Sequence, residues 1–112
     1  MSNKLLKDQI LVSKWGYDQT NVDFYQVTKE AEEGKFAEIK QICSKWHSNA
    51  GRDTQYLMPV PYSFFKENGK EKVFKKKVKV KKWSGNEPYI SLTSYSNAYI
   101  WEGNPVMQTE GH

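Results

Sequence analysis

Hydrophobic and polar positions alternate most clearly between residues 70 and 82. Phe74, Val78 and Val80 share one parity there. Four lysines share the other parity: Lys75, Lys77, Lys79 and Lys81. A period of two residues predicts a β-strand with one apolar face and one cationic face. Successive lysines on that face stand about 6.6 Å apart, twice the rise per residue, and this spacing suits a row of phosphates.

Shorter runs of apolar or alternating residues predict the other strands. The expected strands cover residues 10–15, 22–29, 37–43, 56–60, 89–94 and 98–101. Pro59 and Pro61 should place the strand 56–60 at a sheet edge or end it early, because proline donates no hydrogen bond to a ladder.

Turn residues separate these strands. Asn68-Gly69 is the strongest hairpin signal, because a type I′ turn needs positive φ at both central residues. Gly34 is expected to close a hairpin between strands 22–29 and 37–43, and Ser84-Gly85-Asn86 forms another turn. Residues 44–53 are expected to form a polar loop, and residues 28–34 at most one helical turn. Six or seven short strands with little helix predict a mainly β protein, a small antiparallel barrel or a sandwich.

The composition suits one small domain. A chain of 112 residues is expected to fold as a single domain, and its end segments 1–7 and 106–112 are the parts where fraying is expected unless they pack on the rest of the chain. Four Trp, seven Tyr and five Phe can bury a large area per side chain. The formal charge is +4, and nine of the 17 basic residues lie between Lys66 and Lys82. The charge therefore predicts one basic stripe on a mildly acidic body.

The basic stripe has two interpretations. Its lysines could follow the phosphates of a nucleic acid, with Trp83, Trp46 or Tyr89 stacking on bases. They could instead protect an exposed sheet edge against aggregation. The candidate nucleic-acid-binding residues are Lys75, Lys77, Lys79, Lys81, Lys82, Trp83 and Arg52. A chain with a single arginine has little capacity to read bases, so such binding should not be sequence-specific.

The segment 15–25 carries the second candidate site. Compact polar residues follow Trp15 and Gly16, and such residues commonly fix a turn by bonding to the local backbone. The alternative is a protein-binding surface on which aromatic side chains stand beside short polar groups. Its residues are Trp15, Tyr17, Asp18, Gln19, Asn21 and Tyr25.

Catalytic and metal-binding motifs are weak in this sequence. Cys43 and His47 are four residues apart, but no second pair completes a zinc site. Cys43 shares the parity of Ala37 and Ile39, which predicts a buried residue and not a nucleophile. The sequence has no glycine-rich phosphate loop and no G-x-S-x-G elbow. We expect no enzyme, no cofactor and no metal. A lone cysteine, with no signal peptide or membrane-spanning run, indicates the cytoplasm.

The segment Trp15-Gly16-Tyr17-Asp18-Gln19-Thr20-Asn21-Val22-Asp23-Phe24-Tyr25-Gln26-Val27 resembles a signature of small, mostly uncharacterised proteins of bacteriophages and mobile elements. The region from Ser94 to Gly103, with Gln108-Thr109 and Gly111-His112, is similar to their C-terminal regions. The resemblance implies a phage or mobile-element origin, a host-cytoplasmic location and an SH3-like barrel or half-open barrel. It also implies that the tail folds back beside the loop 15–21, near Tyr99 and Trp101, which join the candidate protein-binding surface.

The expected function is therefore binding. The leading hypothesis is an accessory protein that contacts nucleic acid, or a host nucleoprotein complex, through the lysine-rich strand. The alternative is an inhibitor of a host defence system that binds a host protein through the aromatic and polar loop 15–25. No membrane partner is expected.

Overall fold

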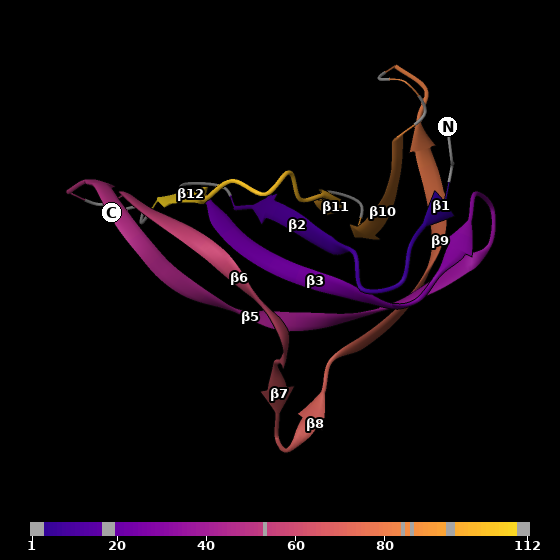
Figure 1. Cartoon of the computed structure of the whole chain (residues 1–112), viewed down its shortest axis with the longest axis horizontal. Coiled ribbons are helices and arrows are strands. Elements are labelled where there is room, and N and C mark those ends of the chain that lie inside the picture. Colours follow the sequence, from indigo (N-terminus) through magenta and orange to yellow (C-terminus); the bar gives the residue numbers. More distant parts are fainter. Residues whose placement is uncertain are drawn as a thin grey trace.

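The computed structural model describes residues 4–16, 20–52, 54–83, 85, 87–93 and 96–109, and these residues form twelve strands and no helix (Figure 1). The strands are β1 (Lys4–Leu5), β2 (Ile10–Trp15), β3 (Asn21–Lys29), β4 (Ala31–Glu32), β5 (Phe36–Gly51), β6 (Thr54–Phe64), β7 (Lys66–Glu67), β8 (Lys70–Glu71), β9 (Val73–Lys81), β10 (Glu87–Thr93), β11 (Ser96–Ile100) and β12 (Val106–Thr109). The mainly β prediction is confirmed, although the described residues form more strands than the six or seven expected.

Eight strands form one antiparallel sheet whose hydrogen-bond ladder returns on itself. The order is β12-β6-β5-β3-β2-β11-β10-β9, and β5 also pairs with β9. The additional pairing sets residues 36–40 opposite residues 73–77, from Phe36↔Lys77 to Lys40↔Val73. Six strands, β5, β3, β2, β11, β10 and β9, therefore make a closed ring of hydrogen bonds.

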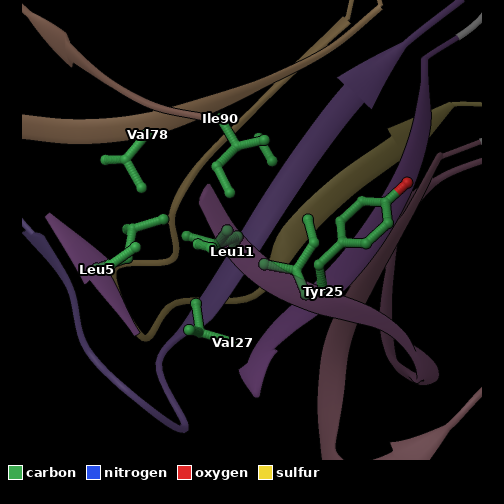
Figure 2. Packing of buried hydrophobic residues seen from close by; sticks show 10 residues of the cluster. Leu5, Leu11, Tyr25, Val27, Val78 and Ile90 are labelled. Atoms are coloured by element: carbon green, nitrogen blue, oxygen red, sulfur yellow. The ribbon is translucent and has the colours of Figure 1, made fainter. Parts of the chain in front are cut away.

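The main core lies inside this ring. Alternate residues of each strand point inward, as the period-two pattern requires. The buried residues of this core are Leu5, Leu11, Tyr25, Val27, Ala31, Ala37, Ile39, Val78, Ile90 and Ala98. Figure 2 shows side chains from β1, β2, β3, β9 and β10 converging on one region. The ring of Tyr25 meets that of Phe74 edge-on, with centroids 5.6 Å apart.

A second, smaller core lies on the opposite face of β3 and β5. It contains Val22, Phe24, Ile42, Leu57 and Val106, so β6 and β12 supply two of its five buried members. The long strands β3 and β5 therefore contribute to both cores, one from each face.

The tail folds back along the start of β3, as the resemblance implied. The backbone N–H of Thr109 donates to the carbonyl of Thr20 over 3.1 Å, and that of Val22 donates to Gln108 Oε1 over 3.1 Å. β12 also pairs with β6 from Val106↔Leu57 to Thr109↔Thr54. Residues 106–109 are thus tied to two strands, whereas 110–112 lie outside the described residues. At the other end Leu5, which was expected to fray, is fully buried.

The hairpin predictions at two glycines are confirmed. Asn68 and Gly69 have φ of +54° and +78° between β7 and β8, as a type I′ turn requires. Gly34 has a φ of +84° in the connection between β3 and β5, which pair antiparallel. Gly85 also has positive φ between β9 and β10, while Ser84 and Asn86 lie outside the described residues.

The prediction of a polar loop at residues 44–53 is wrong, because β5 runs to Gly51 and β6 begins at Thr54. Lys45, Trp46 and His47 are all exposed on this hairpin, so no alternation marks it as strand. The helical turn expected at 28–34 is also wrong. Ala31–Glu32 is β4, which pairs with β1 and places Ala31 beside Leu5.

The prolines do not end their strand. β6 continues through Pro59 and Pro61 to Phe64, but its pairing with β12 stops at Leu57. Pro59 pairs with Ser44 of β5, and Pro61 lies in the irregular stretch between the pairs Ser44↔Pro59 and Ile42↔Phe64. Both prolines lie beyond the residues that pair with β12, so the edge placement holds for this part of the strand.

Candidate nucleic-acid interface

β9 shows the two faces that its sequence predicts. Val78 is 1% exposed inside the ring, and Phe74 and Val80 are half-buried on the same face. Lys75, Lys77 and Lys79 are exposed on the other face. We call Lys75, Lys77, Lys79 and Lys81 the lysine row. Lys76, which shares the inward parity, is half-buried opposite Ala37.

Lys81 differs from the exposed members of the row. Its Nζ lies 3.4 Å from Oε2 of Glu87, its cross-strand neighbour on β10. The same Nζ stands 4.3 Å from the centre of the Tyr99 ring. Lys81 lies on the outward face that its parity predicts, but an ion pair and a cation–π contact hold this side chain half-buried against the sheet.

Aromatic side chains lie along both sides of the row. Residues that pair directly across two strands project on the same face of the sheet. Phe36 pairs with Lys77 and is 65% exposed, and Tyr89 pairs with Lys79. We call Phe36, Trp83, Tyr89 and Tyr99 the aromatic strip.

Ring contacts join three members of the strip. Trp83, which is 73% exposed, follows the end of β9, and its ring centroid lies 6.2 Å from that of Tyr89. Tyr89 in turn lies 5.4 Å from Tyr99. The ring of Trp83 thus lies beside that of Tyr89 while most of its surface stays accessible.

This arrangement places cations and ring surfaces on one face. Ammonium groups can contact phosphates, and an exposed indole can stack on an unpaired base. Two acidic residues flank the row, because Glu38 pairs with Lys75 across β5 and β9, and Glu87 pairs with Lys81 across β10 and β9. The hydroxyl of Thr28 donates to Glu38 Oε2 over 3.1 Å, which directs part of this carboxylate toward β3.

Two residues expected at the same site lie elsewhere. Trp46 is on the part of β5 that pairs with β6, beyond the residues that pair with β9, and its Nε1 donates to Asn49 Oδ1. Arg52 is in the turn between β5 and β6. In Figure 1 this turn lies at the opposite end of the molecule from β9. Lys82 is exposed directly after β9, beside Trp83.

A cleft of about 660 Å³ opens beside Lys81. Its walls come from β2, β6, β9, β10, β11, the start of β12 and the segment 101–105 between β11 and β12. They include Lys14, Lys81, Glu87, Tyr99, Trp101 and Glu102. Sequence reasoning missed this cleft, because the segment after β11 has no periodic pattern that shows where it packs.

Trp101 is held firmly in the wall of the cleft. Its backbone N–H donates to the carbonyl of Ile10 over 2.9 Å, and its indole Nε1 donates to the carbonyl of Asn104 over 2.7 Å. Its ring also packs against the smaller core.

The described residues of the candidate protein-binding surface do not all lie on one face of the sheet. Trp15 is 42% exposed, and its Nε1 donates to Asp23 Oδ2 over 2.7 Å. Tyr99 pairs with Val12, so it projects from the opposite face of β2. Asn21 is half-buried at the start of β3, and Tyr17, Asp18 and Gln19 lie outside the described residues.

Tyr25 is part of the main core and not of a surface. It is 6% exposed, although the loop 15–25 suggested an accessible ring. Burial, and secondarily the negative charge of Asp23, raise the pKa of Tyr25 to about 12.

The lone cysteine lies at the border of the core. Cys43 follows Ala37 and Ile39 on the same parity of β5 but is only half-buried, so the expected burial is partly met. His47 is exposed, with Nδ1 3.0 Å from Ser48 Oγ. Among the described residues, no three His, Cys, Asp or Glu side chains are grouped as metal ligands. The described part of the chain also contains no helix that is long and apolar enough to span a membrane.

Comparison with known proteins adds no relative: no protein-family model matches the chain, and no curated protein and no solved structure matches it.

Proposed function

We propose that this chain is an accessory binding protein of a phage or mobile element that contacts nucleic acid through the lysine row and the aromatic strip. The observation that carries the proposal is the pairing of the two on one face, with Lys77 beside Phe36 and Lys79 beside Tyr89. We further propose that the six-stranded ring is a small barrel of the SH3-like kind. The phage origin and the host cytoplasm rest on the sequence resemblance alone.

Protection of a sheet edge explains fewer features of β9 and its neighbours than nucleic-acid binding does. β9 pairs with β5 over residues 73–77 and with β10 over 78–81. The backbone of Val78 exchanges two further hydrogen bonds with Gly34 and Lys35. Apart from Val78, the described residues of β9 therefore have a strand partner on one side only, and edge protection is compatible with the side that is left unpaired. Edge protection gives no reason, however, for exposed aromatic rings beside the lysines.

Binding of this kind should depend on charge and not on sequence. Ammonium contacts to phosphates carry no base information, and the only arginine, Arg52, lies outside the site. Non-specific affinities in the micromolar to 100 micromolar range are typical at physiological salt.

The test compares two variants that lose the same charge. The first changes Lys75, Lys77, Lys79 and Lys81 to Gln. The control changes four exposed lysines outside β9 to Gln: Lys7, Lys45, Lys66 and Lys70. Fluorescence anisotropy with a labelled single-stranded 20-mer at about 50 mM salt should show at least a tenfold weaker affinity for the first variant and a much smaller loss for the control.

Equal losses in the two variants would indicate general electrostatic attraction and contradict the assigned site. Absence of binding by the unmodified protein would overturn the proposal and favour an acidic protein partner for the lysines. Thermal melts of both variants should match the unmodified protein, because the substituted side chains lie outside the cores.

A further inference from the structure

We propose that the cleft beside Lys81 receives one unpaired base of a single strand whose phosphates lie along the lysine row. This inference rests on the proposed function and adds two things to it, the kind of nucleic acid and the place of one base.

The position of Lys81 connects the row to the cleft. Lys81 is the last member of the row on β9 and also lines the cleft. A nucleic-acid backbone that follows Lys75, Lys77 and Lys79 toward the end of β9 therefore approaches the cleft at Lys81. The ion pair with Glu87 and the contact with Tyr99 fix the Lys81 ammonium at this junction. Lys81 therefore marks where the row meets the cleft, and the exposed lysines Lys75, Lys77 and Lys79 provide the contacts to phosphates.

The size and walls of the cleft suit a flat, partly polar group. A volume of about 660 Å³ lies within the roughly 300–1,000 Å³ range of small-ligand sites. Trp101 lines the cleft, and one hydrogen bond holds its backbone while another, from the indole Nε1, holds its ring. Glu102 and Lys14, both exposed, supply an acceptor and a donor for the edge of a base.

The charges of the cleft explain why the ligand should be a strand and not a free nucleotide. Lys14 and Lys81 are offset by Glu87 and Glu102, so these four side chains provide no net attraction for an anion. The exposed lysines of the row provide that attraction instead. A base that is paired in a duplex cannot present its face to Trp101, so only an unpaired base can enter.

The test separates phosphates from bases. One probe is a labelled 12-mer of thymidylates, and the other is a 12-mer of abasic sites with the same number of phosphates. The unmodified protein should bind the thymidylate strand at least tenfold more tightly, which is about 1.4 kcal/mol, within the range for one stacked base.

Two variants assign that preference to the cleft. Trp101→Leu removes the ring surface, and Met107→Trp adds bulk at an exposed lining residue without removing any core side chain. Both should lose most of the preference for thymidylate and keep the affinity for the abasic strand. Trp83→Leu, which alters the aromatic strip but not the cleft, should keep a measurable preference.

The outcomes distinguish this inference from the proposed function. Equal binding of the two strands by the unmodified protein would overturn the cleft assignment and leave phosphate binding by the row intact. An unchanged preference in Met107→Trp, with a normal thermal melt, would also overturn it. If neither strand binds, both proposals fail.

Discussion

At the residue scale, the phenol of Tyr25 and the hydroxyls of Ser13 and Ser96 are polar groups buried in this fold. The phenol of Tyr25 is enclosed by the main core, where burial and Asp23 raise its pKa to about 12. The hydroxyls of Ser13 and Ser96 lie 2.9 Å apart and bond to each other between β2 and β11. Both serines are buried, so this hydrogen bond replaces their contacts with water.

Tyr25 should make the protein lose stability at high pH. Its folded-state pKa of about 12 lies above the ordinary value of 10.0, so the unfolded chain releases this proton first. The contribution is complete below pH 10 and is lost as the pH rises from 10 towards 12. Urea unfolding at pH 8, 10 and 11 should show a steeper decline for the unmodified protein than for Tyr25→Phe. Identical declines would show that Tyr25 ionises as easily in the folded protein as in the unfolded chain.

The serine pair should show strong coupling in a double-mutant cycle. Ser96→Ala leaves the Ser13 hydroxyl without its partner in a buried position, at a cost of about 1–3 kcal/mol. Replacing both serines by alanine should cost less than the sum of the two single changes, because no hydroxyl is then left unpaired. The free energies of unfolding of the three variants give the coupling. Strictly additive values would mean that the two hydroxyls do not bond in solution.

Among the elements, β9 is the clearest case in which sequence predicts structure. Its inward face packs in the main core through Val78 and Phe74, while its outward face carries lysines whose heads reach solvent. In such a strand apolar and polar residues alternate, so the sequence predicts both that the segment is a strand and which side chains point inward.

Substitutions on the two faces of β9 should have opposite consequences. Val78→Asp places an unpaired carboxylate inside the ring and should cost about 3 kcal/mol or more. Lys79→Asp, one residue further along on the exposed face, should change stability by about 0.5 kcal/mol or less. Thermal or urea melts of both variants measure the difference. A larger cost for Lys79→Asp would mean that the face assignment of β9 is inverted.

The strands that the sequence did not predict lack the combination of one buried face and one exposed face. The hairpin of β5 and β6 continues over residues 44–51, where Lys45, Trp46 and His47 are all exposed and no burial pattern forms. β4 has only two residues and depends on its pairing with β1, a contact between distant parts of the chain. The β-propensity of a two-residue segment does not show which distant strand it pairs with.

At the scale of the whole molecule, closure of the ring is the feature least accessible from sequence. It depends on residues 36–40 pairing with residues 73–77, and no local pattern specifies that register. The candidate interface was predictable in part. The row, Trp83 and Tyr89 could be named from the sequence. Phe36 could not, because only ring closure places it beside Lys77.

The cleft also depends on long-range pairing that the local sequence does not specify. Trp101 and Tyr99 were expected near Trp15, but the pairing of β11 with β2 places them beside Ile10 and Val12. The return of residues 106–109 to β6 and β3 then completes the walls. The site thus depends on two long-range closures of the chain, neither of which is visible in the local pattern of hydrophobic positions.

The salt dependence of binding to a single-stranded oligonucleotide tests the central claim most directly. Three phosphate contacts, from the exposed lysines Lys75, Lys77 and Lys79, predict a slope of roughly −2 for the logarithm of the association constant against the logarithm of salt concentration. The variant with Gln at Lys75, Lys77, Lys79 and Lys81 should have a slope near zero. A slope near zero for the unmodified protein, or the same slope for both proteins, would contradict the assignment of the lysine row as the nucleic-acid interface.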